Sequence, residues 1–428
     1  MMELRSQTEQ IVLATLAAVA PEVLIPRHFS RYGDRLSIDE HEVDIRGRPI
    51  ICLGAGKAAS RMAQTLAHAL GRPFDSGILA TPDGHIGGAP GCSSYAAGHP
   101  VPDERSFTAA TAAMDHARAW RGRDPLVLGV LSGGASALWC LPREGLTLAR
   151  KREAGQWLLA SGLPIDKMNT IRRRLSGIKG GRLAAAMRGA EIHVFVLSDV
   201  PEGHNLDVIG SGPFHPDPTD IDDALAALQE ARVPPPDWLE QAIREAPPKP
   251  DAAAFARVLH HQVGSNRDAM VAAARKVAQL NFQPVFQDRP LTGEAAEVGR
   301  QLADAVRDLP HDRPACLVFG GETTVTLSAV AGRGGRNQEM ALAFSLAIAD
   351  RPNVSLLAFS TDGVDGVSNA AGAFVDGGTV ALMRRRNIDP EQYLARHDSY
   401  HALAAADALI VTGPTSTNVA DLALVFVS

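Results

Sequence analysis

A short apolar run followed at once by a glycine-rich polar turn recurs along this chain, and this recurrence most strongly limits the folds open to it. The fullest copy occupies residues 316–350, where Cys316–Phe319 predicts a buried strand that stops at Gly320-Gly321. Glu322 and Thr323 come next. The pattern therefore predicts a carboxylate and a hydroxyl group at the exit of a strand.

The same stretch continues into a basic loop and a predicted helix. The loop Gly332–Arg336 reads GRGGR, and Asn337 is the expected cap of a helix that carries Met340, Phe344 and Ile348 on one face. Free backbone N–H groups, the positive end of a helix dipole and two guanidinium groups suit a phosphate or a carboxylate. A single loop of this kind is more often a solvated turn, so the argument for binding rests on the repetition of the pattern.

Three earlier apolar runs also end in polar turns, and together they indicate the fold class. In a doubly wound parallel sheet such turns gather along the carboxyl edge of the strands, where open α/β folds bind their ligands. We therefore predict an α/β fold with the site on that edge. The three pairs of run and turn are residues 48–53 with Gly54-Ala-Gly-Lys57, residues 126–131 with Ser132-Gly-Gly-Ala-Ser136, and residues 192–197 with Ser198-Asp-Val-Pro-Glu-Gly-His204.

Composition narrows the class of protein. The chain has 428 residues, of which 45% are hydrophobic, so it can bury a large core and is expected to form two domains. A net charge of -6 offers no electrostatic basis for binding nucleic acid or an anionic membrane. The apolar run Ile11–Ala20 follows two glutamates and one arginine, which is unlike a signal peptide, and we interpret it as a first helix.

The four cysteines are Cys52, Cys92, Cys140 and Cys316. Their wide spacing excludes a zinc knuckle and a CxxC redox motif. We interpret them as reduced thiols of a cytoplasmic protein.

A proline-rich span marks the expected boundary between the domains. Nine of the chain's 28 prolines lie between Pro213 and Pro250, so this span is predicted to be an extended connection around one short helix. We place the N-terminal domain at residues 1–240 and the C-terminal domain at residues 241–428. In the second domain, Ser265-Asn266 is a plausible cap for one helix, and residues 293–306 predict another.

The first glycine turn has two competing interpretations. Gly54-x-Gly56-x-x-Ala59 matches the dinucleotide fingerprint in form, and Asp75 lies at a suitable distance along the chain to bind a ribose. Lys57 occupies the turn itself, however, and an ammonium group there suits a transferring phosphoryl group better. The Ser132–Ser136 turn is equally consistent with a phosphate-binding nest and with close packing of small residues.

Four carboxylates follow predicted strands, namely Asp199, Glu322, Asp362 and Asp365. Each alone is more often a helix or turn cap, but a set of carboxylates at one sheet edge favours a shared divalent cation. His99 and His204 lie in loops, where a lone histidine is more often structural than catalytic.

Taken together, the motifs resemble the class II glycerate 2-kinases, whose C-terminal part is called the MOFRL domain and whose members are often labelled hydroxypyruvate reductases. The resemblance covers most of the chain. It rests on the Gly54–Lys57 turn, Gly98-His-Pro-Val-Pro-Asp103, Leu131–Leu138, Ile178-Lys-Gly-Gly-Arg-Leu-Ala184, Ser198-Asp-Val200, Gly320-Gly-Glu-Thr-Thr-Val-Thr326, Gly332–Glu339 and Thr412-Gly-Pro-Thr415. The chain departs from the family pattern at Val364, Val367, Asn369, Ser416 and Ala420.

The resemblance implies a Rossmann-like N-terminal domain, a smaller α/β domain of the MOFRL type, and an active site in the cleft between them. It also implies phosphorylation of D-glycerate at the C2 hydroxyl by ATP with Mg²⁺ or another divalent cation. Lys57 and Arg336 match the family's catalytic lysine and arginine, and we add Asp199 as the expected base. The expected nucleotide and phosphate contacts are Gly54, Gly56, Ser132, Gly133, Gly134, Ser136, Lys179, Gly321, Thr323, Arg333 and Gly335, and the expected metal ligands are Asp199, Glu322 and Asp362.

Two other functions remain open at this point. An NAD(P)H-dependent hydroxypyruvate reductase would use the same three-carbon acid, but it needs a nicotinamide pocket and a proton donor that the sequence does not display. A non-catalytic sensor of phosphorylated metabolites would use the glycine turns and leave the carboxylates idle. We expect glycerate and ATP as the partners, without nucleic acid or membrane, and the oligomeric state stays open, a homodimer included.

Overall fold

The computed structural model describes residues 2–85, 87–198, 206–306, 313–327 and 331–428. The chain forms two compact units. The N-terminal domain comprises residues 24–198 and 206–263, and the C-terminal domain combines residues 264–428 with residues 2–23. The units thus divide after residue 263, whereas the proline-rich span had suggested residue 240.

The N-terminal domain is built on a six-stranded sheet of the order β6-β5-β4-β7-β8-β9. Strand β4 lies at the centre, and it pairs in parallel with β5 on one side and β7 on the other. This is the Rossmann order 3-2-1-4-5-6, in which the chain reverses direction across the sheet between the first and fourth strands. The predicted doubly wound fold is confirmed. The strands are β4 (Ile50–Ala55), β5 (Ser76–Thr81), β6 (Ser93–Ala96), β7 (Leu126–Leu131), β8 (Glu191–Leu197) and β9 (Val258–Gly264).

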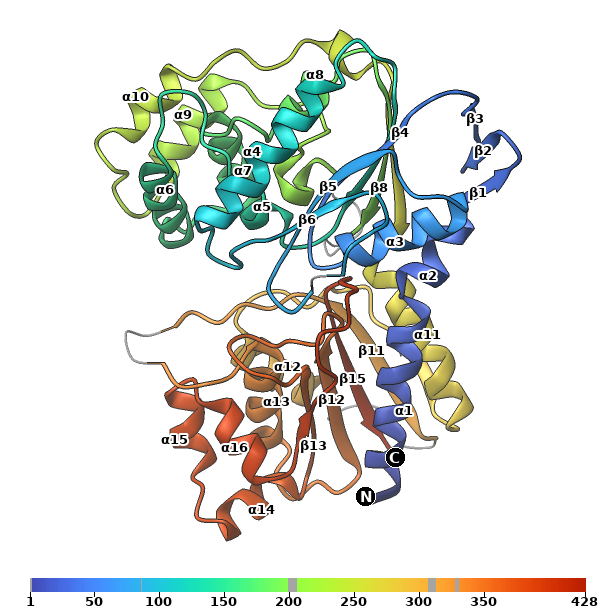
Figure 1. The fold of residues 1–428 in the computed structure, drawn as a ribbon. Coiled ribbons are helices and arrows are strands. Elements are labelled where there is room, and N and C mark those ends of the chain that lie inside the picture. Colours follow the sequence, from blue (N-terminus) through green and yellow to red (C-terminus); the bar gives the residue numbers. More distant parts are fainter. Residues whose placement is uncertain (1, 86, 199–205, 307–312, 328–330) are drawn as a thin grey trace. The chain divides into compact units, whose positions relative to one another are not determined.

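Helices cover both faces of this sheet (Figure 1). Helix α3 (Ala59–Leu70) lies on one face, where Met62 and Leu66 are fully buried, as its apolar spacing predicts. Helices α4 (Glu104–Ala119), α5 (Ala135–Leu138) and α8 (Arg182–Ala186) lie on the other face. A small antiparallel sheet precedes the main one and consists of β1 (Phe29–Tyr32), β2 (Arg35–Ile38) and β3 (His41–Asp44).

Four further helices of this domain pack around a hydrophobic cluster of their own. Ala224 and Leu228 of α9 and Ile243 of α10 are buried in it. The proline-rich span therefore contains two helices that contribute to a core, and the prediction of an extended connection was wrong there. Prolines limit where a helix begins, but they do not stop the residues between them from packing. The four helices are α6 (Leu148–Ala160), α7 (Ile165–Arg174), α9 (Ile221–Glu230) and α10 (Leu239–Arg244).

The C-terminal domain contains a mixed sheet of the order β10-β11-β15-β12-β13-β14. Strand β15 runs antiparallel to both of its neighbours, β11 and β12, so those two point the same way. Gly321 and Ser360 at their carboxyl ends both pair with Asp421 at the start of β15. The strands are β10 (Gln283–Phe286), β11 (Ala315–Gly321), β12 (Val354–Ser360), β13 (Gly372–Asp376), β14 (Leu409–Ile410) and β15 (Asp421–Val427).

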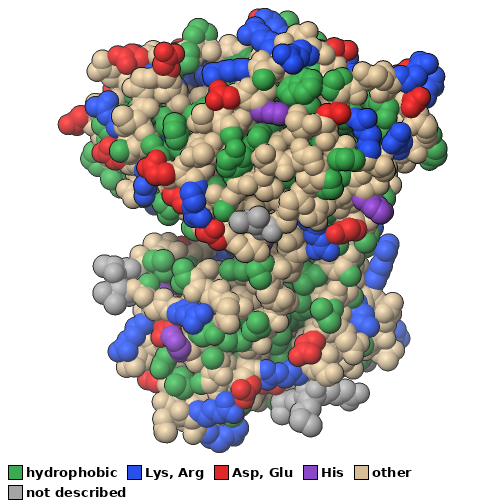
Figure 2. All heavy atoms as spheres, viewed as in Figure 1, with side chains coloured by type: hydrophobic (Ala, Val, Ile, Leu, Met, Phe, Trp, Pro, Cys, Tyr) green, Lys and Arg blue, Asp and Glu red, His purple; other side chains and the backbone are tan. Residues whose placement is uncertain are grey.

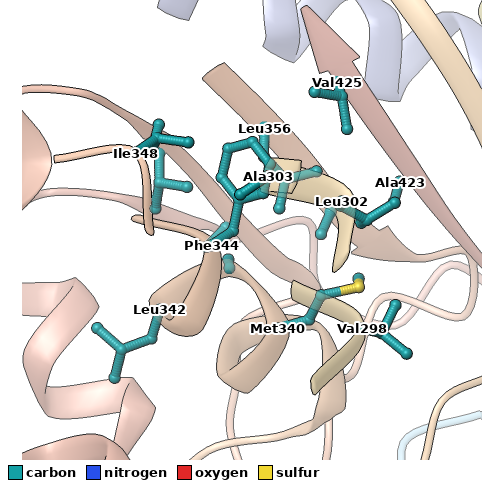
Figure 3. Close-up of a cluster of buried hydrophobic side chains, with 14 of the residues drawn as sticks. Val298, Leu302, Ala303, Met340, Leu342, Phe344, Ile348, Leu356, Ala423 and Val425 are labelled. Atoms are coloured by element: carbon teal, nitrogen blue, oxygen red, sulfur yellow. The ribbon is translucent and has the colours of Figure 1, made fainter. Parts of the chain in front are cut away.

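Helices α12 (Ala295–Ala305) and α13 (Arg336–Ala347) cover one face of this sheet. Figure 3 shows Met340 and Phe344 of α13 within the apolar cluster that also holds Leu302 of α12 and Leu356 of β12. The predicted apolar face of α13, with Ile348 directly after it, is confirmed. Three short helices complete this side, α14 (Thr379–Arg385), α15 (Pro390–Ala395) and α16 (Ser399–Ala405).

Helices α1 (Met2–Ala18) and α11 (Asn266–Gln279) lie side by side on the other face (Figure 1). Ser265 caps α11 as predicted, and its backbone N–H donates to Asp268 at 2.9 Å. The Thr417 hydroxyl donates to the carbonyl oxygen of Val19 at 2.6 Å, which ties the start of the chain to the C-terminal domain.

Among the described helices, none is long and apolar enough by itself to span a membrane; the bent pair Leu4–Ala18 and Pro21–Arg27 meets that criterion by length and composition only. On the face drawn in Figure 2, acidic and basic side chains are intermixed and do not gather into one large basic area.

Candidate active site

Two glycine turns join at the carboxyl edge of the N-terminal sheet, where β4 and β7 end. The Lys57 N–H donates to the carbonyl oxygen of Gly133 at 3.0 Å, and the Ala58 N–H donates to Ser132 Oγ at 3.0 Å. Gly56 has a φ of 138°, and a Cβ at this position would lie 2.1 Å from Ser132 Oγ. Only glycine permits this approach. The two turns therefore form one surface at the topological switch point, the place where doubly wound folds bind ligands.

Lys57 stands on that surface, half-buried, with polar groups around it. A Cβ on Gly134 would lie 3.1 Å from the His99 ring and 3.6 Å from Lys57 Cγ, so these three residues are neighbours. His99 thus belongs to the candidate site, although the sequence favoured a structural role. Close to Lys57 in sequence, the buried hydroxyl of Ser60 has no hydrogen-bond partner among the described residues.

Two residues of the dinucleotide interpretation lie elsewhere. Gly54 is inside β4, and a Cβ there would meet Val130 Cγ2 at 2.1 Å, so this glycine serves strand packing and not the turn. The Asp75 carboxylate accepts the backbone N–H of Ile50, the first residue of β4, at 2.7 Å. Asp75 is therefore at the amino edge of the sheet, opposite to the glycine turns, and cannot hold a ribose beside them.

A chain of hydrogen bonds extends from the second glycine turn. Lys179 donates through its ammonium group to the carbonyl oxygen of Ser136 at 2.7 Å, and the Ser136 and Ser211 hydroxyls lie 3.2 Å apart. Ser211 donates to Asn169 Oδ1 at 3.0 Å, and Arg172 Nη1 donates to the same oxygen at 3.2 Å. The predicted residues Ser136 and Lys179 are thus brought together, and Arg172, Asn169 and Ser211 join them without having been predicted.

This chain of hydrogen bonds includes two basic side chains, Lys179 and Arg172, in a poorly solvated environment. Burial lowers the pKa of Lys179 well below its usual value, and the nearby Lys151 lowers it further. Burial also lowers the pKa of Arg172, and it lowers the pKa of Lys151 to about 8. An anion placed here would reduce the mutual repulsion of these groups, so the region is suited to a carboxylate or a phosphate.

At the edge of the C-terminal sheet, Arg336 is held by two carboxylates. Its Nε and Nη2 donate to the two oxygens of Asp421 at 2.5 and 3.0 Å, and its Nη1 donates to Glu322. Burial alone would lower the pKa of this guanidinium, but the charges of Asp421 and Glu322 raise it well above the usual value. The contacts use three of the five N–H donors of the guanidinium. Asp421 was not predicted, although its place directly before the apolar run 422–427 offered a signal.

The N-terminus of α13 already holds an anion, the carboxylate of Asp365. Its oxygens accept the backbone N–H groups of Asn337 and Gln338 at 3.1 and 2.8 Å, and the Gln338 side-chain amide donates at 2.9 Å. The predicted cap at Asn337 was wrong, because the N-cap residue is Gly335 and the capping carboxylate comes from another loop. A Cβ on Gly335 would lie 2.3 to 2.5 Å from Asp365 atoms. Gly335 therefore makes room for Asp365, and the helix N-terminus is not open to phosphate.

Burial raises the pKa of Asp365 to about 6, and the charge of Asp421 adds to this rise. The backbone N–H groups at the helix start and the Arg336 guanidinium oppose it. The carboxyl group is still ionised at neutral pH.

The remaining predicted contacts of this domain differ in their availability. Arg333 is exposed and stacks on the Tyr400 ring, with Cζ 4.0 Å from the ring centroid, so it faces that ring and the loop at Val367. Gly321 ends β11 opposite Asp421. Thr323 is 3% exposed, and its buried hydroxyl has no hydrogen-bond partner among the described residues.

Of the predicted metal ligands, the described residues Asp362 and Glu322 are each engaged by neighbouring protein groups. Asp362 is buried and accepts the Ser360 hydroxyl and the Val364 N–H, both at 2.9 Å, so it stabilises its own turn. Glu322 contacts Arg336, and its side chain is 44% exposed. Asp199 and His204 lie outside the described residues. Within the described part of the chain, no group of three or more histidine, cysteine, aspartate or glutamate side chains could hold a metal ion.

Comparison with known proteins gives consistent matches over most of the chain. Residues 7–246 match the model of a domain of unknown function, DUF4147, and residues 315–421 match the MOFRL family. A D-glycerate 2-kinase of Thermotoga maritima is 38% identical over 379 residues, which cover 87% of this chain and 89% of that protein. A putative hydroxypyruvate reductase of Agrobacterium vitis is 39% identical over 388 residues, with 89% and 88% covered. The crystal structure of a glycerate kinase from Thermotoga maritima superimposes with a TM-score of 0.82 at 34% identity and covers all of both chains.

Proposed function

The chain belongs to the class II glycerate 2-kinase family, and we propose that it transfers the γ-phosphoryl group of ATP to the C2 hydroxyl of D-glycerate. The kinase function is favoured over the reductase by the relatives named glycerate kinase. One structural observation carries the proposal. The Lys57 turn and the Ser132–Gly134 turn are hydrogen-bonded to each other at the switch point of the sheet, while Asp75, which the nicotinamide interpretation needs, is at the opposite edge.

Lys57 is proposed to neutralise charge on the transferring phosphoryl group. In-line attack by the C2 hydroxyl spreads negative charge over the equatorial oxygens, and preorganised cations stabilise that charge in the transition state. The lysine suits this task because two backbone N–H groups of its turn donate hydrogen bonds to the Ser132–Gly134 turn, while its side chain is half-buried. The backbone of the Ser132–Gly134 turn and the Ser60 hydroxyl supply further candidate donors to ATP.

Arg336 is proposed to act as a second, rigid donor to the phosphoryl oxygens. Asp421 occupies the Nε–Nη2 edge of the Arg336 guanidinium. Binding of the substrate carboxylate by that same edge is therefore less favourable. Glu322, which directly follows β11, contacts Arg336 and is partly exposed. Thr323 is the next residue and is proposed as a further donor to ATP. Gly321, Arg333, Gly335 and Asp362 are assigned to supporting this loop arrangement and not to direct contact with ATP.

The glycerate carboxylate then needs another cation. We assign binding of this carboxylate to the hydrogen-bonded group that contains Arg172, Ser136 and Lys179, which is net positive and poorly solvated. A guanidinium group and hydroxyl groups recognise a planar carboxylate by charge-assisted hydrogen bonds. Binding there would orient C2 for attack, which is the positional contribution that bound substrates receive.

Mg²⁺ fits the donors that are present. The ion keeps an octahedral shell and is usually bound by one or two carboxylates together with substrate phosphates and water, so a complete protein cage is not needed. Glu322, whose side chain is 44% exposed, is our proposed ligand among the described carboxylates, and Asp199 remains a proposed ligand in the loop outside the described residues. When bound, the ion would neutralise charge on the ATP phosphates. Asp199 is also our proposed base, since a carboxylate can orient the C2 hydroxyl and accept its proton.

A direct assay tests the proposal. The purified protein is incubated with D-glycerate, ATP and Mg²⁺, and in parallel with hydroxypyruvate and NADH. Formation of 2-phosphoglycerate in the first mixture is expected. Oxidation of NADH in the second mixture without phosphoglycerate in the first would support the reductase, and inactivity in both would support a sensor. We further propose a cytoplasmic location, in which the four cysteines stay free thiols.

A further inference from the structure

A pocket of about 370 Å³ lies in the C-terminal domain at the edge of the sheet opposite to Arg336. Ser355, the second residue of β12, borders it, while Ser360 at the other end of β12 pairs with Asp421. Five residues at about 3.3 Å each separate these two serines by roughly 17 Å. The volume falls within the range of small-molecule sites, about 300 to 1,000 Å³. The pocket is therefore large enough for a ligand and separate from Arg336 and its carboxylates.

A row of three side chains crosses the sheet at this pocket. Ser355 pairs directly with Phe426 of β15 on one side and with Asp376 of β13 on the other. Directly opposite residues have Cβ atoms about 4.5 to 5.5 Å apart and point to the same face. Phe374 also borders the pocket, and the Phe282 ring packs edge-on against Phe426 at 5.2 Å. Phe282, Ser355 and Asp376 thus border one small volume together with Phe374 and Phe426, which are only 5% and 1% exposed.

The hydroxyl of Ser355 is the least expected of these groups. The residue is 4% exposed, and its Oγ has no hydrogen-bond partner among the described residues. Leaving a buried hydroxyl unpaired costs about 1 to 3 kcal/mol, so native structures contain few such groups. Leu356 and Ala358 point into the core beneath α12 and α13. Because side chains alternate along a strand, Ser355 points to the other face, where the pocket lies.

The charge of the lining restricts the ligand further. Asp376 is the charged side chain at the pocket, and no lysine, arginine or histidine side chain borders it among the described residues. One Asp376 oxygen accepts the Gly378 N–H at 2.9 Å and the Thr379 hydroxyl at 3.0 Å. The carboxylate is therefore fixed in place. A phosphate or carboxylate ligand would find a like charge and no cation, which excludes glycerate and intact nucleotides as good ligands.

We propose that this pocket binds a neutral, planar heteroaromatic molecule with a hydrogen-bond acceptor beside an N–H donor, the chemistry of a free nucleobase. Its ring would lie against Phe282, the least buried of the three phenylalanines at the pocket. The Ser355 hydroxyl would donate a hydrogen bond to the ring acceptor, and the N–H group of the ligand would donate to the Asp376 carboxylate. Because the pocket is at the other edge of the sheet from Arg336, such a ligand does not compete with the kinase substrates. The proposal stands independently of the kinase reaction.

The test measures binding of adenine to the full-length protein by equilibrium dialysis, with excess Mg²⁺-ATP present to fill the nucleotide site. Saturable binding is expected. Ser355→Ala should weaken it about five-fold or more, since one neutral hydrogen bond is lost. Ser355→Leu should weaken it further, because the substitution removes the hydroxyl and places a bulkier apolar side chain at the pocket wall. Ser345→Ala is the matched control, because that buried serine already donates to the Leu342 carbonyl oxygen at 2.8 Å, and it should bind adenine as the wild type does.

Three results would overturn the proposal. The first is the absence of saturable binding to the wild-type protein. The second is unchanged affinity in a folded Ser355→Ala variant, with folding checked by its melting temperature. The third is AMP binding as tightly as adenine, because a phosphate should be disfavoured beside Asp376.

Discussion

Arg336 donates side-on to both carboxylate oxygens of Asp421, at 2.5 and 3.0 Å, so its guanidinium plane is fixed by the protein. A fixed plane directs the remaining N–H groups in one direction. Lysine has no such plane and holds its charge at the end of a flexible stem.

Arg336→Lys should therefore lower kcat severely even though the charge is kept. Loss of one preorganised contact to the transition state typically costs on the order of 10² to 10³ in kcat. Steady-state kinetics of 2-phosphoglycerate formation measures the effect. Asp421→Asn is the companion variant, because it keeps Arg336 but weakens the contact that orients it, and it should lose less activity than Arg336→Lys. Near-normal turnover of Arg336→Lys would exclude a role for the guanidinium fork.

Lys57→Ala should lower kcat on the order of 10² to 10³ and raise either KM much less, since the proposed contact forms with charge that develops in the transition state. The melting temperature should stay close to that of the wild type, because backbone N–H groups of Lys57 and Ala58 donate the hydrogen bonds that hold the turn. Lys167→Ala, which removes only a surface ion pair with Glu230, serves as the control. Wild-type turnover in folded Lys57→Ala would refute the catalytic assignment and leave the family membership intact.

Arg172→Gln should raise the KM for glycerate by about ten-fold to a hundred-fold, which is the effect of losing one hydrogen bond from a charged donor. The KM for ATP should change little. Glutamine can still donate to Asn169, so the hydrogen-bonded chain is conserved as far as substitution allows. An increase confined to the KM for ATP would place the nucleotide, and not glycerate, at this cation.

Asp365 should make stability depend on pH between about 4 and 6. Its pKa is raised to about 6 in the folded protein, above its usual value of 3.8, so the folded state binds more protons in this range. Its contribution to the free energy of unfolding is therefore greatest below pH 4 and falls as the pH rises to 6, by up to about 3 kcal/mol.

Urea denaturation of the wild type and of Asp365→Asn at several pH values measures this effect. The difference in the free energy of unfolding, wild type minus variant, should decrease from pH 4 to pH 6 and then level off. A flat difference over this range, with an increase as the pH rises towards 4, would mean that the backbone N–H groups of Asn337 and Gln338 outweigh burial and lower the pKa.

Removal of divalent cations with EDTA should abolish phosphoryl transfer, and added Mg²⁺ should restore it, because the proposed reaction uses the ATP–metal complex. Binding of ATP measured by calorimetry should weaken in parallel. Glu322→Gln should raise the Mg²⁺ concentration required for half-maximal activity. Full turnover in EDTA would contradict the kinase proposal.

The sequence was most informative where the signal was local. Strand β7 has the predicted bounds, and the apolar face of α13 follows directly from the spacing of Met340, Phe344 and Ile348. Alternation of such strands with helices was sufficient to predict the doubly wound sheet. The pairing of the Lys57 turn with the Ser132 turn is a consequence of that topology and needed no further information.

Relations between distant residues could not be predicted in this way. Asp365 caps a helix that begins 29 residues earlier, and Asp421 orients an arginine 85 residues away. Neither relation leaves a local pattern, because the partners meet only when β12 and β15 lie side by side. Asp75 is an error of the opposite kind. Its spacing from the glycine turn suited a ribose site, but the residue lies at the amino edge of the sheet, away from that turn.

The capping of α13 by Asp365 also bears on how the GRGGRNQE segment could be reused in protein engineering. Residues 332–339 do not form a complete helix start by themselves, because the space beside Gly335 is occupied by the Asp365 side chain from another loop. A graft of the segment alone would create a helix start open to whatever anion the buffer contains. A graft that also includes residues 361–366 would carry the Asp365 carboxylate, which occupies the helix N-terminus. Arg336 would then be the group of this segment that remains to bind an added phosphate.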